Sequence, residues 1–222
     1  EINPDIIIDL ASISNVGAAE EHFDKVRDIN VKGLRNLVRT FDKKIIYMSS
    51  DYVFDGDKGN YNLNDSPKPI NKYGKAKFDA EELLRKSKDF AIIRSSLVYG
   101  KTKEGQHPNF VTMCIDKLNS KQEIIAYSNM WRTPTYVEDI SETIAKIIKE
   151  DLKGTFHVGS PNYLNMYDFA LQISEVFKLD NELIKKSEIK ETKKPLKCGL
   201  DVTETEEVLG LKFRKTIEGL NK

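Results

Sequence analysis

Short apolar segments alternate along this chain with longer amphipathic segments, and this alternation constrains the fold more than any other feature. Short apolar runs bounded by turn residues are typical of buried strands, and longer runs with a period near 3.6 residues are typical of helices. Strands that alternate with helices favour a parallel sheet covered by helices on both faces. We expect strands at residues 5–11, 45–49, 90–95, 123–126 and 155–158, and helices at 18–41, 70–86 and 108–119.

Two further helices are indicated by the residues at their N-termini. Thr135 and Glu138 have the spacing of a capping box, and Asn165 and Asp168 form a second polar pair at the same spacing. Apolar residues with helical periodicity follow both pairs. Residues 178–195 are rich in charge, which is usual for a face exposed to solvent.

Four residues on two neighbouring elements carry the candidate chemistry. The strand at 45–49 leads into the hydroxyls of Ser49 and Ser50, and the helix at 70–86 carries Tyr73 and Lys77. A spacing of four places the phenol and the ammonium on one helical face, one turn apart. A nearby ammonium favours the phenolate and would lower the tyrosine pKa toward neutrality. With a serine hydroxyl to hold a substrate oxygen, these groups suit the addition or removal of hydride at a carbon that bears oxygen.

The Tyr-x-x-x-Lys spacing fits a solvated helix face equally well. A second pair, Tyr99 and Lys103, lies in a glycine-containing segment that is typical of a loop. Context distinguishes the first pair, because the segment from Arg94 to Gly100 ends the next predicted strand.

Several segments follow one another in the order of a known family. They are Pro4 to Ser12, Asn15-Val16, Ala19-Glu20, Ile29 to Gly33, Asn36-Leu37, Ser49 to Gly56, Tyr73-Gly74-x-x-Lys77, Arg94-x-Ser96-x-Val98-Tyr99-Gly100, Asn109 to Val111 and Pro134 to Asp139. With these segments the chain resembles the extended short-chain dehydrogenase/reductases, and within them the dTDP-4-dehydrorhamnose reductase branch.

The resemblance implies a Rossmann-like, doubly wound α/β fold with a small C-terminal lobe for the substrate. Residues 1–100 and 133–160 would form the C-terminal part of the dinucleotide-binding domain. Residues 101–132 and 161–222 would form the lobe that binds a nucleotide-sugar.

The glycine-rich phosphate turn of the family is missing from these 222 residues, which contain neither G-x-G-x-x-G nor G-x-x-G-x-x-G. The chain starts at Glu1, before what resembles the fourth strand of the family's sheet. We therefore expect an N-terminal truncation of roughly 50 to 70 residues. We also expect this fragment alone to be inactive and to bind no dinucleotide tightly. The residue that distinguishes NAD from NADP would lie in the missing part.

The resemblance assigns roles in catalysis and in cofactor binding. Tyr73 would donate a proton to the C4 oxygen of the sugar, Lys77 would bind the nicotinamide ribose, and Ser50 would hold the carbonyl oxygen. The cofactor would be NADPH or NADH. The residues expected near it are Ala11, Ser12, Ser49, Tyr73, Lys77 and Ser96. Asn30 matches a family position where a structural role is expected.

The resemblance also implies a set of residues near the nucleotide-sugar. These are Ser50, Asp51, Leu97, Asn109 and Arg132. Arg132 would pair with the diphosphate through its planar fork, although a surface arginine is an equal alternative. For Asn109, a plain helix N-cap is an equal alternative. Leu97 stands where the bacterial reductases carry a tryptophan, so the sugar pocket is altered; Trp131 is expected mainly in core packing.

The function expected is the NAD(P)H-dependent reduction of a 4-keto nucleotide-sugar, most simply dTDP-4-dehydrorhamnose to dTDP-rhamnose. Two alternatives remain open. One is another nucleotide-sugar epimerase or dehydratase, although dehydratases place an acidic pair where this chain has Asp51-Tyr52. The other is a non-catalytic subunit that resembles the β subunit of methionine adenosyltransferase.

Composition bounds the partners. With 35 basic and 35 acidic residues, nothing favours capture by nucleic acid or by a membrane. Two cysteines and three scattered histidines predict neither a disulfide framework nor a metal site. No apolar run reaches membrane-spanning length. We expect a cytoplasmic protein with a small-molecule substrate, and a homodimer is left open.

Overall fold

The computed structural model describes residues 3–103 and 105–222 and contains a four-stranded parallel sheet. The strand order is β1-β2-β3-β8, and each neighbouring pair is parallel. These strands are β1 (Ile6–Asp9), β2 (Lys44–Ser50), β3 (Phe90–Ser95) and β8 (Gly154–Val158). The predicted doubly wound α/β fold is therefore confirmed.

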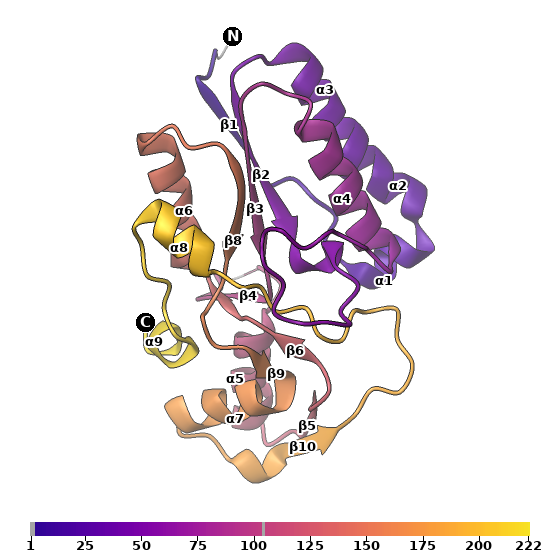
Figure 1. Ribbon diagram of the computed structural model, residues 1–222. Coiled ribbons are helices and arrows are strands. Elements are labelled where there is room, and N and C mark those ends of the chain that lie inside the picture. Colours follow the sequence, from indigo (N-terminus) through magenta and orange to yellow (C-terminus); the bar gives the residue numbers. More distant parts are fainter. Residues whose placement is uncertain (1–2, 104) are drawn as a thin grey trace.

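Helices cover both faces of this sheet, so that the upper part of the molecule has three layers (Figure 1). One layer contains α1 (Val16–Glu21), α2 (Phe23–Arg27), α3 (Leu34–Thr40) and α4 (Lys72–Leu84). The opposite layer contains α6 (Val137–Lys149) and α8 (Thr203–Leu209). Both faces of the central strands are apolar for this reason: Ile45 and Ile92 pack toward α3 and α4, whereas Ile46 and Ile93 pack toward α6 and α8.

The single helix predicted at 18–41 is wrong in detail. Asn15 begins α1 by accepting a hydrogen bond from the Ala18 amide, and the helix ends at His22, before α2 starts. A π-helical turn at Asp28–Gly33 then separates α2 from α3. Buried Asn30 in this turn bonds both the amide and the carbonyl of Ile13, at 2.9 and 3.1 Å. Asn30 thus fixes the loop after β1, the structural role expected for it.

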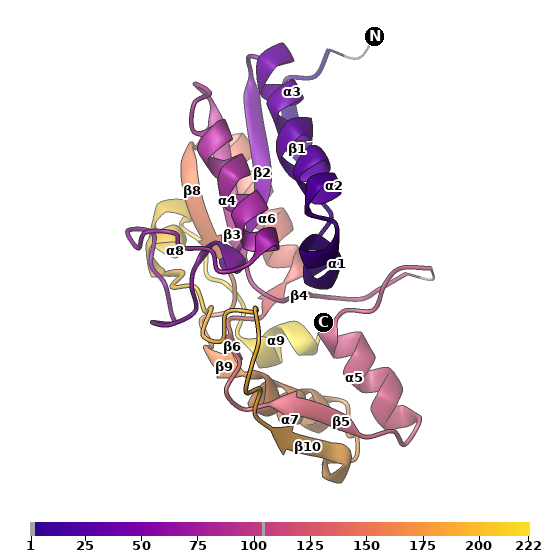
Figure 2. The ribbon, with the colours of Figure 1, turned by 90° about the vertical axis from the view of Figure 1, so that its right-hand side faces the viewer.

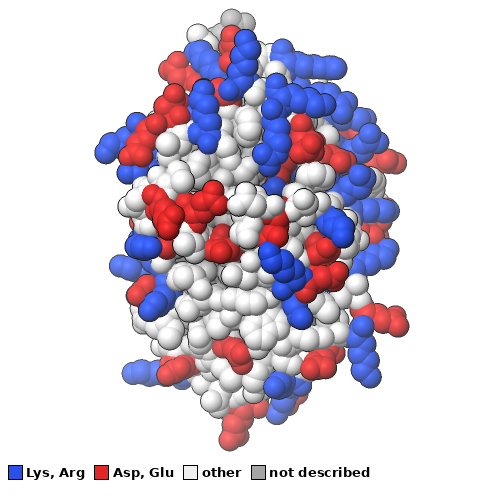
Figure 3. Space-filling view, in the orientation of Figure 1, with Lys and Arg blue, Asp and Glu red and all other residues white. Residues whose placement is uncertain are grey.

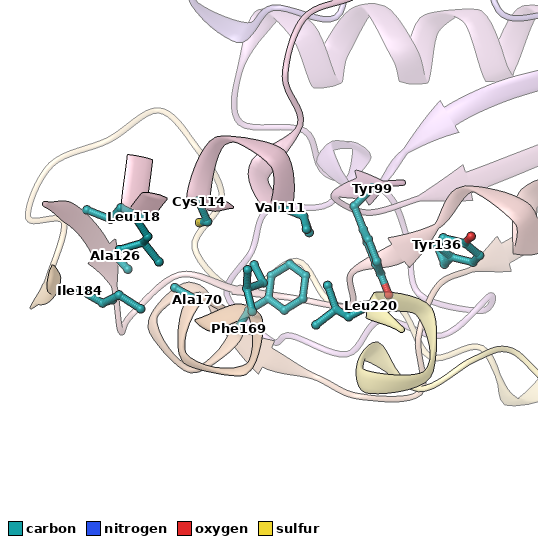
Figure 4. Close-up of a cluster of buried hydrophobic side chains, with 12 residues drawn as sticks. Tyr99, Val111, Cys114, Leu118, Ala126, Tyr136, Phe169, Ala170, Ile184 and Leu220 are labelled. Carbon is teal, nitrogen blue, oxygen red and sulfur yellow. The ribbon is translucent and has the colours of Figure 1, made fainter. Parts of the chain in front are cut away.

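A smaller lobe lies below the carboxyl ends of the strands (Figures 1 and 2). Its core surrounds Phe169, which is fully buried and packs against Tyr99 (Figure 4). Phe169 also stacks on Phe110. Asn165 caps α7 by accepting from the Asp168 amide at 2.9 Å, as predicted. The lobe's elements are α5 (Phe110–Asn119), β5 (Ile124–Tyr127), β6 (Trp131–Arg132), β9 (Leu164–Asn165), α7 (Met166–Val176) and β10 (Ile184–Ser187). Strand β10 pairs parallel with β5, and β9 pairs antiparallel with β6.

The connection between sheet and lobe passes through β4 (Val98–Tyr99) and β7 (Thr135–Tyr136), which pair in parallel. The predicted capping role of Thr135 is wrong: Tyr136 is the N-cap of α6 and makes no side-chain cap. The Thr135 hydroxyl instead contacts the Ser96 carbonyl at 2.7 Å and the Val158 carbonyl at 3.1 Å. This threonine therefore joins the ends of β3 and β8.

The C-terminal part of the chain contributes to both regions. Val202, Leu209 and Phe213 pack in the cluster beneath the sheet, beside β8 and α6. The short helix α9 (Thr216–Leu220) then packs against the lobe, where Leu220 joins the cluster around Phe169. Of the residues 161–222 expected in the lobe, those near 202–213 lie against the sheet.

The surface shows charges of both signs (Figure 3). Lys and Arg are most numerous over the upper end, near α3 and α4, and the middle of the lobe is largely uncharged in this view. Strand β1 is an edge of the four-stranded sheet. Ile8 within this strand and Leu10 just after it are exposed. Among the described residues, no helix is both long enough and apolar enough to cross a membrane.

Candidate active site

A cavity of about 370 Å³ lies at the carboxyl ends of β2 and β3, where the sheet meets the lobe. Ligands of open parallel α/β sheets bind in this position. The cavity brings together six of the predicted site residues: Ser49, Ser50, Asp51, Tyr73, Leu97 and Arg132.

A second cavity, of about 400 Å³, lies in the lobe between α5, α7 and α9. Its walls are mainly apolar and include Tyr99, Val111, Phe177 and Leu220. None of the predicted site residues lines it. Because the groups suited to proton transfer gather in the first cavity, we assign the candidate active site there.

Tyr73 reaches the cavity from the first turn of α4. Asn71 caps this helix by accepting from the Gly74 amide at 2.7 Å. A methyl group on Gly74 would lie 2.0 Å from the Tyr52 carbonyl oxygen, so only glycine allows this close approach. The Tyr52 and Tyr73 rings meet edge to face, with centroids 5.7 Å apart. The glycine next to the tyrosine therefore sets the distance between α4 and the end of β2.

The predicted lowering of the Tyr73 pKa by Lys77 is wrong. Burial raises the Tyr73 pKa well above its ordinary value, and the charges of Asp51 and Tyr52 add to this. The hydroxyl of Ser50 hydrogen-bonds Tyr73 and acts in the opposite direction. Tyr73 therefore keeps its proton at neutral pH, the form required of a proton donor.

Lys77 lies one turn further along α4, and its side chain is almost wholly buried. Its ammonium donates to the Met48 carbonyl at 2.8 Å and lies 4.9 Å from the centroid of the Tyr47 ring. Burial lowers its pKa to about 8, while the carboxylates of Asp9 and Glu81 act against this shift. An ammonium carries three N–H donors, and the described residues offer this one an acceptor for a single donor. Two donors of Lys77 therefore have no hydrogen-bond partner among the described residues, although the side chain does not line the cavity.

Ser50 is fixed by its neighbour Asp51. The Ser50 hydroxyl donates to Asp51 Oδ1 at 3.0 Å, and Ser96 donates to Asp51 Oδ2 at 2.7 Å. Burial raises the pKa of Asp51, and Arg132, Ser96 and Ser50 oppose that rise. Ser96 is fully buried and does not line the cavity, so its hydroxyl supports Asp51 in this structure.

Arg132 lines the cavity, but its guanidinium is bonded throughout to the protein. Its Nη1 donates to the carbonyls of Trp131 at 2.7 Å and Leu196 at 3.1 Å. Its Nη2 donates to the Pro195 carbonyl at 2.9 Å and to the Tyr52 hydroxyl at 3.4 Å. Its Nε lies 3.5 Å from the carboxylate of Asp51. An arginine has five N–H donors. Four of them make hydrogen bonds within the protein here, and the fifth, on Nε, faces Asp51 at ion-pair distance.

Ser49 faces a different partner from its neighbour. Its hydroxyl donates to Glu81 at 2.5 Å, and Glu81 also accepts two hydrogen bonds from Arg94. The alternative role, in which Ser49 supports the end of the strand, fits this contact. Ser49 nevertheless lines the cavity, so part of it faces the space where a ligand would lie.

The loop after β1 carries Ala11 and Ser12. The Ala11 amide donates to Asp9 at 3.0 Å, and the Ile13 amide donates to Asn30. The Ser12 hydroxyl is buried and has no partner among the described residues. An unpaired buried hydroxyl is costly and is often found where a ligand completes the bonding.

Leu97 and Asn109 differ in their accessibility to a ligand. Leu97 lines the cavity and has a φ of 45°, a strained value for a residue with a side chain. Asn109 caps α5 by accepting from the amides of Val111 and Thr112, and it donates to the Gly100 carbonyl at 2.7 Å. The alternative role of Asn109 as an N-cap is thus observed. Trp131 packs on Tyr163, with ring centroids 5.2 Å apart, and does not line the cavity.

Sequence reasoning missed the two carboxylates near Lys77. Asp9 ends β1 and is buried, and Glu81 lies one turn beyond Lys77 on α4 with no exposure. The position of Asp9 at the end of an apolar strand was a usable signal. Glu81 gave none, because its pairing with Arg94 joins residues of different elements.

Comparison with known proteins identifies the family of this chain. A family model described as the RmlD substrate binding domain matches residues 1–222. The chain belongs to this family. Among solved structures, the dTDP-4-dehydrorhamnose reductase of Bacillus anthracis, in complex with NADP, superposes with a TM-score of 0.89. It is 29% identical, and the match covers 98% of this chain and 79% of the Bacillus chain.

Curated relatives include proteins with different roles. The methionine adenosyltransferase 2 subunit beta of Bos taurus is 30% identical over 190 residues, which are 81% of this chain and 56% of the bovine protein. The spore coat polysaccharide biosynthesis protein SpsK of Bacillus subtilis is 33% identical over 187 residues, 82% of this chain and 64% of SpsK. The chain thus spans little more than half the length of the bovine relative.

Proposed function

We propose that this chain is the catalytic and substrate-binding part of an NAD(P)H-dependent reductase that acts on the 4-keto group of a nucleotide-sugar. The most direct candidate reaction converts dTDP-4-dehydrorhamnose to dTDP-rhamnose. The observation that carries the proposal is the position of Tyr73, whose protonated phenol lies with Ser50 in the cavity and one turn before Lys77. The likeness to the Bacillus anthracis reductase supports the choice of substrate.

The residues at the site fit a nicotinamide cofactor. The ammonium of Lys77 has donors left for ribose hydroxyls, and the buried hydroxyl of Ser12 lacks a partner among the described residues. We propose that Lys77, Tyr73 and the backbone near Ala11 and Ser12 bind NADPH or NADH. When bound, the reduced nicotinamide supplies a hydride.

Tyr73 supplies the proton that completes the reduction. Hydride addition to a carbonyl carbon leaves negative charge on the oxygen, and proton transfer from the Tyr73 phenol gives the alcohol. Because burial keeps Tyr73 protonated, the donor is ready at neutral pH. The developing tyrosinate is then stabilised by the positive charge of Lys77. At neutral pH Lys77 is mostly protonated, because its pKa is about 8.

The sugar would lie against Leu97 and Val98, which form an apolar wall of the cavity. This wall suits a deoxysugar, whose methyl group needs no hydrogen-bonding partner. The diphosphate roles considered for Arg132 and Asn109 receive no support from geometry. Arg132 makes four hydrogen bonds within the protein, and Asn109 caps α5 and donates to the Gly100 carbonyl. A direct contact of Asp51 with the substrate receives no support either, because both of its carboxylate oxygens already have partners within the protein.

A non-catalytic subunit is the second candidate. The similarity to the bovine methionine adenosyltransferase subunit favours it, because that relative is as similar in sequence as the Bacillus anthracis reductase. Tight cofactor binding without turnover of any 4-keto sugar would support this alternative.

The test uses the protein expressed from the complete reading frame that contains this chain. We would follow the oxidation of NADPH and NADH with dTDP-4-dehydrorhamnose, and compare Tyr73→Phe with Tyr127→Phe in the lobe. We expect turnover in the parent and in Tyr127→Phe, and a loss of at least about a hundredfold in Tyr73→Phe. Unchanged turnover in Tyr73→Phe would contradict the proposal.

The same preparation tests two further expectations. We propose a cytoplasmic protein, to be checked by cell fractionation. A homodimer stays a prediction, to be checked by sedimentation.

A further inference from the structure

The guanidinium of Arg132 is buried among partners within the protein. Its side chain is 3% exposed, makes four hydrogen bonds inside the protein and pairs with the Asp51 carboxylate through Nε. A phosphate could reach it only by displacing carbonyl groups such as those of Pro195 and Leu196. Those carbonyls would lose their partner inside the protein, which costs free energy. The contacts of Arg132 therefore indicate a role inside the protein.

Its charged partner is Asp51, which lies next to Ser50. Arg132 Nε and the Ser96 hydroxyl both approach Asp51 Oδ2, at 3.5 and 2.7 Å. The other oxygen, Oδ1, accepts from the Ser50 hydroxyl at 3.0 Å. An ionised carboxylate only accepts hydrogen bonds, so the Ser50 hydrogen points at Asp51. Asp51 therefore fixes the Ser50 hydroxyl in the cavity that Tyr73 also lines.

Three separate parts of the chain meet at this arginine. It belongs to β6 of the lobe, and it donates hydrogen bonds to carbonyls of the segment that follows β10. Its guanidinium lies 5.3 Å from the centroid of the Tyr52 ring. A buried ion pair is tolerated only when its remaining hydrogen bonds are satisfied, as they are here. The pair thus holds Asp51 at a fixed distance from Ser50.

We propose that Arg132 and Ser96 are positioning residues that act through Asp51 on the Ser50 hydroxyl, and that Arg132 is not a ligand of the substrate's phosphates. This proposal rests on the proposed reductase function and explains how the hydroxyl of Ser50 is oriented in the site. Ser96 gives the cleanest test, because it is fully buried, does not line the cavity and cannot touch the substrate in this arrangement.

The experiment compares Ser96→Ala, Arg132→Gln and Asp51→Asn in the complete protein, with Ser174→Ala as control. Ser174 is a buried serine of α7 whose hydroxyl donates to the Leu171 carbonyl at 2.8 Å, far from this network in the lobe. For each variant we would measure kcat and, by calorimetry without cofactor, the dissociation constant for dTDP. Combining Ser96→Ala with Asp51→Asn gives a double-mutant cycle.

We expect Ser96→Ala and Arg132→Gln to lower kcat by about tenfold or more while dTDP affinity stays within about twofold, since loss of a hydrogen bond to a charged group costs at least this much. The double variant should be no slower than Asp51→Asn alone. A tenfold loss of dTDP affinity in Arg132→Gln, with Ser96→Ala unchanged in kcat, would overturn the proposal. Strictly additive effects in the cycle would overturn it as well.

A readout without turnover separates this proposal from the reductase function. Carbon NMR of labelled aspartate, assigned with Asp51→Asn, reports the Asp51 pKa. The titratable or charged groups around Asp51 are Arg132, Tyr52, Tyr73 and Cys198. Ser96→Ala removes a hydrogen bond that lowers the Asp51 pKa, so the titration should move to higher pH, and Ser174→Ala should not move it. If it does not move in Ser96→Ala, the proposed coupling is wrong, whether or not the protein is a reductase.

Discussion

Arg94 on β3 donates two hydrogen bonds to Glu81 on α4, at 2.6 and 2.9 Å, and both side chains are buried. The same carboxylate accepts from Ser49 at the end of β2. This contact ties the helix that carries Tyr73 and Lys77 to two strands of the sheet. It fixes where the catalytic face of α4 lies.

Removal of Arg94 should strongly destabilise the protein. In Arg94→Met the Glu81 carboxylate stays buried without its main partner, which typically costs about 3–5 kcal/mol. Urea unfolding measures the loss. The control is Lys32→Met, which removes an exposed pair with Asp28 and should change stability by less than about 0.5 kcal/mol. Equal losses in the free energy of unfolding for the two substitutions would show that the buried pair stabilises the protein no more than the exposed one.

Gly74 and Gly33 give a matched pair of alanine substitutions. An added methyl on Gly74 would lie 2.0 Å from the Tyr52 carbonyl, whereas on Gly33 its nearest neighbour is 4.0 Å away. We expect Gly74→Ala to cost roughly 1–3 kcal/mol or more through overpacking and to displace Tyr73 from Ser50. Gly33→Ala lies in helical backbone and should be neutral or stabilise by up to about 1 kcal/mol. Thermal unfolding distinguishes the two, and a stable, fully active Gly74→Ala variant would refute the packing argument.

Lys77 should make stability rise with pH above neutrality. Its pKa is about 8 in the folded protein and near 10.5 when exposed. Between these values the unfolded chain holds the proton and the folded protein does not, so folding is favoured as pH increases. From pH 7.5 to 9.5 the parent should gain about 2 kcal/mol relative to Lys77→Met, measured by urea unfolding at both pH values. A constant difference between the two proteins would mean that Lys77 titrates normally.

His157 should make stability fall as the pH drops into the acid range, the same sign of pH dependence as for Lys77. Burial and the charge of Arg94 lower its pKa to about 3, and its Nδ1 lies 3.2 Å from the Asp201 carbonyl. Between its folded value and its ordinary pKa of 6.5 the unfolded chain binds the proton, so stability falls as pH drops. From pH 6.5 to 4.5 the parent should lose about 2 kcal/mol more than His157→Gln. His22→Gln, at an exposed site, is the control and should track the parent.

Local signals in the sequence predicted the elements of the sheet well. The strand at 90–95 has its predicted bounds, and the helix with Tyr73 begins and ends within two residues of expectation. Asn165 caps α7 as its spacing indicated. These features depend on neighbours in the chain, which periodicity and capping patterns record directly.

Features that depend on distant partners were not predictable in the same way. The lowered pKa expected for Tyr73 followed from Lys77 alone, whereas burial by surrounding elements controls the actual value. Thr135 has a capping spacing but bonds to Ser96 and Val158 across the sheet. Arg132 meets carbonyls more than sixty positions away, a contact that no local pattern of residues encodes.

The most direct test of the proposed reaction follows the hydride itself. The protein from the complete reading frame would be incubated with dTDP-4-dehydrorhamnose and with NADPH or NADH carrying deuterium at the transferable position. Proton NMR and mass spectrometry would then locate the label in the product. We predict one deuterium at C4 of the sugar, and its absence in Tyr73→Phe. A protein that binds the reduced cofactor but leaves C4 unlabelled would contradict the reductase function and favour the non-catalytic subunit.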